Sequence, residues 1–308
     1  MRPTEPQAIW LDIDGLRVHC LTAGEHGSPV VLLHGAGVDS ASLSWGEVIE
    51  PCSTHHRVFA PDLPGYGQSS RPEIRYTIDF YVSIVEQVLD NLHLKKVSLV
   101  GLSLGGAIAL ALTLRSPVRV EKLVLVDTYG IQDKVAAQTL SYLYVQLPFL
   151  NELSWWLLGR CRSLVRWSLL TSLIYNPAHL SDELVNRVYQ AMREPRAEKA
   201  YVSFQRSEVR WAGLRSDFTS RLHEITVPTL FVHGAEDRAV PLAAVQQAHA
   251  LIPHSELFIM SECRHWPQRE QPEEFIRVTG NFLGDRTVKH LPLEKKLLSL
   301  PSPAVRQP

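Results

Sequence analysis

Short runs of β-branched and other apolar residues, each ended by turn-forming residues, recur along the chain and predict strands. The predicted strands are 16–21, 29–34, 57–61, 97–102, 122–127, 227–233 and 255–260. Several of them, including those at 29–34 and 122–127, hold continuous apolar runs with no polar residue at alternate positions. Such strands are typical of a parallel sheet covered by helices on both faces. The pattern therefore predicts an α/β fold with a mostly parallel, twisted sheet.

Apolar residues at helical spacing lie between these strands. From Ile78 to Leu92 they recur every three or four residues, directly after Thr77, a residue type that caps helix N-termini. The stretch 271–283 has similar spacing and is followed by Gly284, which suits the left-handed backbone at a helix end. Residues 285–308 combine prolines and a lysine pair with a few leucines, a composition typical of a C-terminal tail.

The middle of the chain, residues 131–221, shows helical patterns but no convincing strand. We therefore predict that residues 1–130 and 222–284 form the core and that 131–221 is an inserted helical lid. Four of the seven tryptophans fall in this insertion: Trp155, Trp156, Trp167 and Trp211. Aromatic side chains dominate protein cores, so these residues either line an apolar acyl-binding face or pack the lid helices together.

Composition argues against several classes of partner. The 308 residues carry a formal net charge of -1, which provides no electrostatic footprint for nucleic acid or an anionic membrane surface. The four cysteines form no C-x-x-C pair, so neither a zinc site nor a disulfide framework is indicated. The uncharged stretch 97–114 just reaches the length of a membrane span, but its glycines favour a strand that turns into a helix. With no secretory signal pattern at the N-terminus, we expect a cytoplasmic protein without a membrane span.

The stretch Gly101-Leu102-Ser103-Leu104-Gly105 has the form G-x-S-x-G. It follows an apolar predicted strand and opens a run of small residues with helical character, which is the setting of a nucleophile elbow. Small residues are needed there because the sharp turn passes close to its neighbours and strains the serine backbone. The pattern predicts Ser103 as a catalytic nucleophile.

A serine hydroxyl is a poor nucleophile at neutral pH, so it needs a neighbouring base, and the base needs an acid that fixes its tautomer. With the chain order serine, acid, histidine, the candidates lie in the loops after the last two predicted strands. We predict Asp237 as the acid and His265 as the base. Asp127, which also ends a strand, remains an alternative acid, and Glu236 ranks below it.

An oxyanion that develops during catalysis needs fixed hydrogen-bond donors. The backbone amide of Leu104, directly after the nucleophile, is one candidate. The second is the amide of Ala36, in a loop that directly follows the strand 29–34. The neighbouring residues of that loop are candidate substrate contacts: His34, Gly35 and Gly37.

Together these residues resemble the α/β-hydrolase superfamily over residues 8–284. The motifs that carry the resemblance are HG, DLPGYGQS, GLSLGG, HGAEDRAVPL and CRHW. The resemblance implies no metal and no cofactor, and it implies a structural turn for DLPGYGQS. Epoxide hydrolases and haloalkane dehalogenases share the scaffold but place an aspartate at the elbow, where this chain has Ser103.

Within the superfamily, the run CRHWPQ at 263–268 and Glu270 are similar to the meta-cleavage product hydrolases, which split carbon–carbon bonds in dienoate ring-fission products. That resemblance implies that Trp266 faces the substrate, although a packing role is equally open. It also implies a lid arginine for the substrate carboxylate near Val188, with Arg187 one position away. The chain further departs from the family at HGAGV, where HGGGPG is usual, and at Ser44, where asparagine is usual.

The sequence thus predicts a lid-covered serine hydrolase that acts on a small-molecule acyl substrate. Because the lid is rich in tryptophan, carboxylic esters with apolar parts are the expected substrates. Carbon–carbon hydrolysis of meta-cleavage-type keto acids is the alternative within catalysis. A non-catalytic ligand-binding protein on the hydrolase scaffold is the alternative outside it. The oligomeric state is left open.

Overall fold

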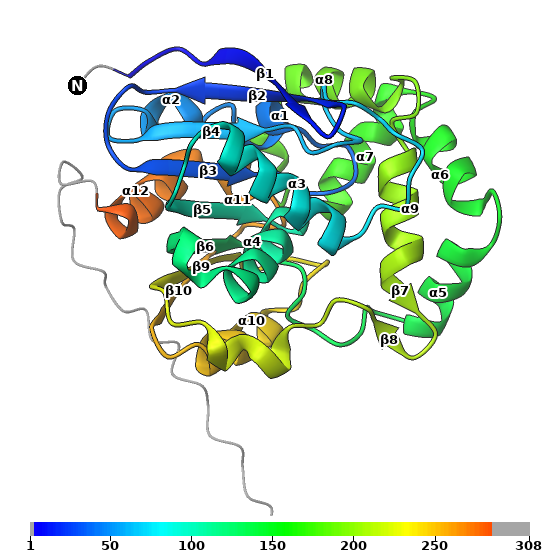
Figure 1. Ribbon diagram of the computed structural model, residues 1–308. Coiled ribbons are helices and arrows are strands. Elements are labelled where there is room, and N and C mark those ends of the chain that lie inside the picture. The colour runs from blue at the N-terminus through cyan, green and yellow to red at the C-terminus, as the bar shows by residue number, and fades with distance from the viewer. Residues whose placement is uncertain (1–2, 285–308) are drawn as a thin grey trace, which may run out of the picture.

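The computed structural model describes residues 3–284, and most of its strands form one sheet (Figure 1). The eight strands of that sheet follow the order β1-β2-β4-β3-β5-β6-β9-β10. Their bounds are β1 Gln7–Ile13, β2 Leu16–Ala23, β3 Pro29–Leu33, β4 Arg57–Pro61, β5 Val97–Leu102, β6 Val120–Val126, β9 Thr229–Gly234 and β10 Ser255–Met260. β2 is antiparallel to β1 and β4, whereas the pairs from β4 through β3, β5, β6 and β9 to β10 are all parallel. The predicted α/β class with a mostly parallel sheet is confirmed.

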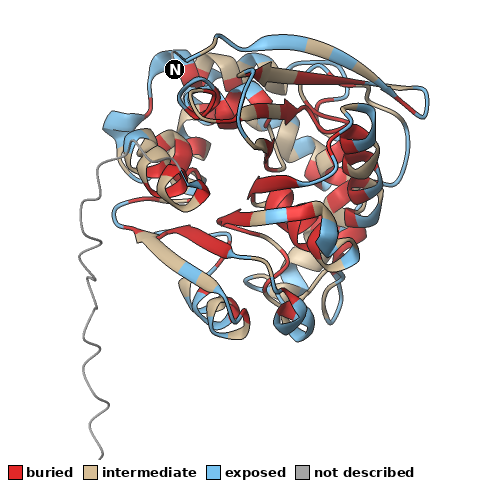
Figure 2. Ribbon diagram, turned by 60° about the vertical axis from the view of Figure 1, so that its left-hand side comes forward, coloured by how far each residue is buried: buried red, intermediate tan, exposed pale blue. Residues whose placement is uncertain are grey.

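Helices cover both faces of this sheet. The helices that pack on it or cap its ends are α1 Ala41–Trp45, α2 Ile49–Cys52, α3 Ile78–Asn91, α4 Leu104–Arg115, α10 Leu242–Leu251, α11 Pro267–Glu270 and α12 Pro272–Leu283. Successive residues of one strand enter different cores: Val31 and Leu33 pack with α3 and α4, whereas Val30 and Leu32 pack with α1 and α12. Both faces are buried, which explains the continuous apolar runs, and Figure 2 shows the inner strands buried at the centre.

Most local signals in the sequence have the expected structural result. The Thr77 hydroxyl accepts a hydrogen bond from the amide of Phe80 at the start of α3. Gly284 ends α12 with a φ of 106°. The stretch 97–114 divides into β5 and α4 at Ser103, and among residues 3–284 no helix is long and apolar enough to cross a membrane.

The sequence missed three strands. β1 is an edge strand whose side chains are mostly exposed, although its sequence contains the short apolar run 8–11. The other two, β7 Val209–Arg210 and β8 Gly213–Leu214, form a hairpin of two residues a side within the insertion. Such short strands carry no periodic signal.

The insertion between β6 and β9 is otherwise helical. Its α-helices are α5 Gln138–Gln146, α6 Leu150–Leu158, α7 Arg162–Ser172, α8 Asp182–Met192 and α9 Lys199–Glu208. They gather on one side of the sheet, beyond the carboxyl ends of its parallel strands (Figure 1). Ligands of parallel α/β sheets bind at that edge, so the insertion lies where it can cover a site.

Candidate active site

The turn at Ser103 is strained and tightly packed. Ser103 joins β5 to α4 with φ 49° and ψ −110°, a backbone conformation that L-residues rarely adopt. A Cβ atom on Gly105 would lie 2.1 Å from the carbonyl oxygen of Leu33, and one on Gly101 would lie 2.3 Å from that of Gly105. Both glycines are therefore required by space, and the turn places Ser103 at the end of the sheet.

His265 and Asp237 lie together after neighbouring strands. Nδ1 of His265, in the loop after β10, is 2.8 Å from Oδ2 of Asp237, in the loop after β9. The other oxygen of Asp237 accepts the amide of Ala239 at 2.7 Å, which fixes the carboxylate. Parallel strands in register, with Met260 opposite Gly234, bring these two loops to the same edge.

Electrostatics favour a charged Asp237 and a basic His265. Burial by itself would lower the pKa of His265, but the charge of Asp237 and the hydrogen bond to it raise that pKa to about 8. Burial tends to raise the pKa of Asp237, yet His265 and the Ala239 amide outweigh it and lower that pKa. The arrangement holds a proton on Nδ1 of His265 and leaves Nε2 as the basic atom.

Asp127, the alternative acid, has a different partner. Its Oδ1 lies 2.9 Å from Nδ1 of His233 and accepts the amide of Gly234 at 3.0 Å. Asp127 and His233 are fully buried, and burial raises the pKa of Asp127. Asp237 therefore contacts the predicted base directly, whereas Asp127 pairs with His233. No sequence signal marked His233 as the partner of Asp127.

The candidate oxyanion donors are the amides of Leu104 and Ala36. Leu104 is the first residue of α4, so its N–H has no intrahelical acceptor. Ala36 lies in the loop after β3 and lines the same cavity as Ser103. Asp39 braces this loop, because its carboxylate accepts the amides of Gly35 and Ser40. The sequence did not single out Asp39, although an acid four residues after Gly35 was a visible signal.

A cavity of about 560 Å³ opens above Ser103 between the sheet and the insertion. His265, Ala36 and Trp266 form its inner wall with Ser103. Apolar residues of the insertion supply most of the opposite wall: Trp155, Leu158, Val165, Leu169, Leu173, Val188 and Met192. Ser103 and His265 thus face one largely apolar cavity, as nucleophilic catalysis requires.

The predicted substrate contacts divide into two groups. Gly35, Gly37 and Trp266 line the cavity. His34 and Arg187 do not. Nδ1 of His34 is 2.7 Å from the Gly35 carbonyl and its Nε2 accepts the amide of Leu63, so both ring nitrogens are used within the protein.

Arg187 is turned away from the catalytic cavity. Its guanidinium donates to the backbone carbonyl of Ser42 at 2.9 Å, on the outer surface of the core. Val188, the next residue of α8, faces the cavity instead. Adjacent residues on a helix differ by about 100°, so the two side chains cannot both face the cavity. The cation that does line it is Arg238, which follows Asp237 and which the sequence did not mark.

The loop that carries His265 also holds the end of α7. The guanidinium of Arg264 donates to the carbonyls of Leu170 and Ile174. The carboxylate of Glu270 accepts the amides of Tyr175 and Asn176, both at 2.7 Å. These hydrogen bonds connect the insertion to the segment that carries the predicted base, His265.

One group among residues 3–284 has the spacing of a metal site. It consists of Asp127, Asp237 and His265, each of which offers an atom within 4.8 Å of the others. Nδ1 of His265 and Oδ2 of Asp237 already bond to each other, and Asp127 contacts His233. These partners match the acid–histidine pair of a catalytic triad better than a set of metal ligands.

Comparison with known proteins agrees with this geometry. Residues 28–272 match the family model described as the alpha/beta hydrolase fold. The chain is 33% identical over 260 residues to 2-hydroxy-6-oxo-2,4-heptadienoate hydrolase from Pseudomonas putida. The alignment covers 83% of this chain and 89% of that protein. It is 32% identical over 283 residues to a 2-hydroxymuconate semialdehyde hydrolase from Pseudomonas putida, covering 90% and 94% of the two chains.

Solved structures indicate the same family. A meta-cleavage product hydrolase from Pseudomonas fluorescens superimposes with a TM-score of 0.76 at 28% identity and covers 90% of this chain and 97% of that one. The chain therefore belongs to the α/β-hydrolase fold family, as a hydrolase whose relatives include the meta-cleavage product hydrolases.

Proposed function

We propose that this protein is a serine hydrolase that cleaves a carbon–carbon bond beside a ketone in an acyclic keto acid. The observation that carries the hydrolase chemistry is that Ser103 and His265 line one apolar cavity, with Asp237 bonded to His265. The choice of carbon–carbon cleavage rests on relatives named as hydrolases of 2-hydroxy-6-oxo-dienoates. It reverses the order expected from the sequence, where esters ranked first.

In the proposed mechanism His265 takes part in every proton transfer. Nε2 of His265 takes the proton of Ser103 as Oγ bonds to the ketone carbon, and the amides of Ala36 and Leu104 hold the resulting oxyanion. Collapse of this intermediate breaks the carbon–carbon bond, and the departing carbanion receives the proton from His265. Water, deprotonated by His265, then hydrolyses the ester on Ser103.

A dienoate also carries a carboxylate, which needs a cation. Arg238 is the one lysine or arginine among the described residues that line the cavity, and we assign it this contact. Its Nη1 donates to the Thr171 carbonyl at 3.3 Å, a weak bond that a carboxylate can replace.

Ester cleavage is the second candidate, and one observation favours it. Where the resemblance to the meta-cleavage product hydrolases implies an arginine, the cavity is lined by Val188. An apolar wall there suits an acyl or alcohol group without charge. The triad and the oxyanion donors would act on an ester in the same way, with an alkoxide as the leaving group.

Turnover of matched substrates separates the two candidates. We expect kcat/KM to be higher for a 2-hydroxy-6-oxo-dienoate than for p-nitrophenyl butyrate. Arg238→Gln should raise KM for the dienoate about 10- to 100-fold, since a charge-assisted hydrogen bond is lost, and should change KM for the uncharged ester little. Turnover of the ester alone would assign the protein to ester hydrolysis.

Activity is expected to fall in acid. His265 must be neutral to accept the serine proton, and its pKa is raised to about 8. We therefore expect kcat/KM to rise with pH up to about pH 8 and to lose a factor of about ten for each unit below that value. The measurement is a pH–rate profile on an uncharged ester, with folding checked by circular dichroism at each pH. An acid limb centred below pH 6 would contradict the proposed environment of His265.

A further inference from the structure

Trp155 lines three neighbouring cavities. It lines the catalytic cavity, a second hollow of about 520 Å³ beside the loop after β3, and an outer groove of about 680 Å³. Met192 lines both the catalytic cavity and the outer groove. Because both residues line both spaces, we refer to Trp155 and Met192 as the wall between the catalytic cavity and the groove.

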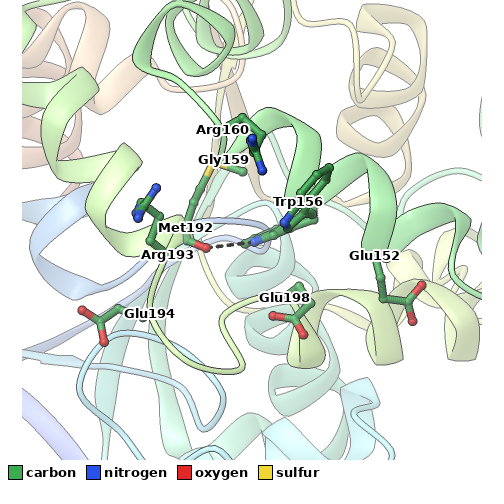
Figure 3. A pocket seen from close by; sticks show the side chains of 9 residues that line it. Glu152, Trp156, Gly159, Arg160, Met192, Arg193, Glu194 and Glu198 are labelled. Carbon is green, nitrogen blue, oxygen red and sulfur yellow. Dashed lines mark hydrogen bonds between the residues drawn. The ribbon is translucent and has the colours of Figure 1, made fainter.

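The outer groove lies between α6 and the segment after α8 (Figure 3). Charged residues form much of its lining: Glu152, Arg160, Arg193, Glu194 and Glu198. The catalytic cavity on the other side of Trp155 is mainly apolar. The indole therefore separates two environments of different polarity.

Two contacts hold the indole in this position. Its Nε1 donates to the carbonyl of Met192 at 3.1 Å. Its ring lies 6.0 Å from that of Tyr201, which also lines the catalytic cavity. The hydrogen bond joins α6 to the end of α8, so the wall is fixed from both helices.

We propose that Trp155 determines substrate length, because its indole closes the catalytic cavity toward the outer groove and limits the apolar chain that fits above Ser103. This inference rests on the proposed function, since it requires Ser103 to react at the inner end of the cavity. It assigns a role to one of the four insertion tryptophans. Trp156, its neighbour, lines the groove only and is 54% exposed, with the Arg160 guanidinium 4.6 Å from its ring.

The test measures how fast alkyl fluorophosphonates of different length label Ser103. The readout is the ratio of second-order labelling rates for a decyl and an ethyl reagent, determined by intact-protein mass. Trp155→Ala should raise this ratio about tenfold or more, because the longer chain can then extend into the space that the indole fills. Trp155→Phe retains a ring without the N–H donor and should leave the ratio within about threefold of wild type, as should the matched control Trp156→Ala.

A second variant covers the case in which Trp155→Ala does not fold. Met192→Ala opens the same wall from the other helix and should raise the ratio in the same direction. An unchanged ratio in a folded Trp155→Ala or Met192→Ala protein would overturn the role of the wall, as would an equal rise in Trp156→Ala. If the wild type is not labelled at all by the ethyl reagent, the proposed function itself fails, and the length limit fails with it.

Discussion

Replacing Ser103 by alanine is expected to lower kcat by about 10⁶-fold on any substrate that the enzyme turns over. The hydroxyl oxygen forms the bond to the carbonyl carbon, and no other side chain occupies its place on the strained turn between β5 and α4. Residual turnover should come only from the oxyanion donors and from substrate binding. Progress curves at high enzyme concentration would measure this loss.

The control for Ser103→Ala is a serine outside the cavity. Ser83 lies on the exposed side of α3, where its hydroxyl donates to the Asp79 carbonyl, and Ser83→Ala should retain wild-type turnover. A fluorophosphonate should add one equivalent of mass to wild type and to Ser83→Ala, but none to Ser103→Ala. Stoichiometric labelling of Ser103→Ala would show that the nucleophile is another residue.

Replacing Asp237 by asparagine is expected to lower kcat by about 10⁴-fold. An asparagine amide can donate to Nδ1 of His265, which would place the ring proton on Nε2, the atom that must accept the proton of Ser103. The variant also removes the charge that stabilises the protonated imidazole. Steady-state kinetics, with thermal unfolding to verify the fold, would measure the effect.

Asp127→Asn is the matched comparison for Asp237→Asn. Both variants make the same chemical change near His265, but Asp127 pairs with His233, whereas Asp237 bonds to His265 itself. We expect a much smaller loss of kcat and a shift of the acid limb to lower pH, because the charge of Asp127 contributes to the raised pKa of His265. A larger loss in Asp127→Asn than in Asp237→Asn, with both proteins folded, would make Asp127 the catalytic acid.

The sequence could not decide which of two adjacent residues on α8 faces the cavity. Arg187 and Val188 are adjacent in sequence, and only the rotation of α8 about its axis decides which of them faces the cavity. In the structure Arg187 contacts the carbonyl of Ser42, and Val188 lines the cavity. We therefore propose that the substrate carboxylate binds Arg238, in the loop after β9, and not Arg187.

The sequence by itself determined the features that depend on local chemistry. Continuous apolar runs specified the inner strands, because both faces of a parallel sheet are buried, and Gly101 and Gly105 specified the turn at Ser103, because a side chain there would overlap the backbone. The order of serine, acid and histidine selected Asp237 and His265, which the structure brings within 2.8 Å of each other.

Only the tertiary structure decided the contacts that join distant segments. The pairing of Asp127 with His233, the brace at Asp39 and the wall at Trp155 all depend on how separate elements pack. The hairpin β7–β8 also escaped prediction, since strands of two residues carry no periodic signal. The periodicity of apolar residues indicates which face of a helix or strand is buried. The contacts between residues of different elements depend on how those elements pack, which a local sequence pattern does not specify.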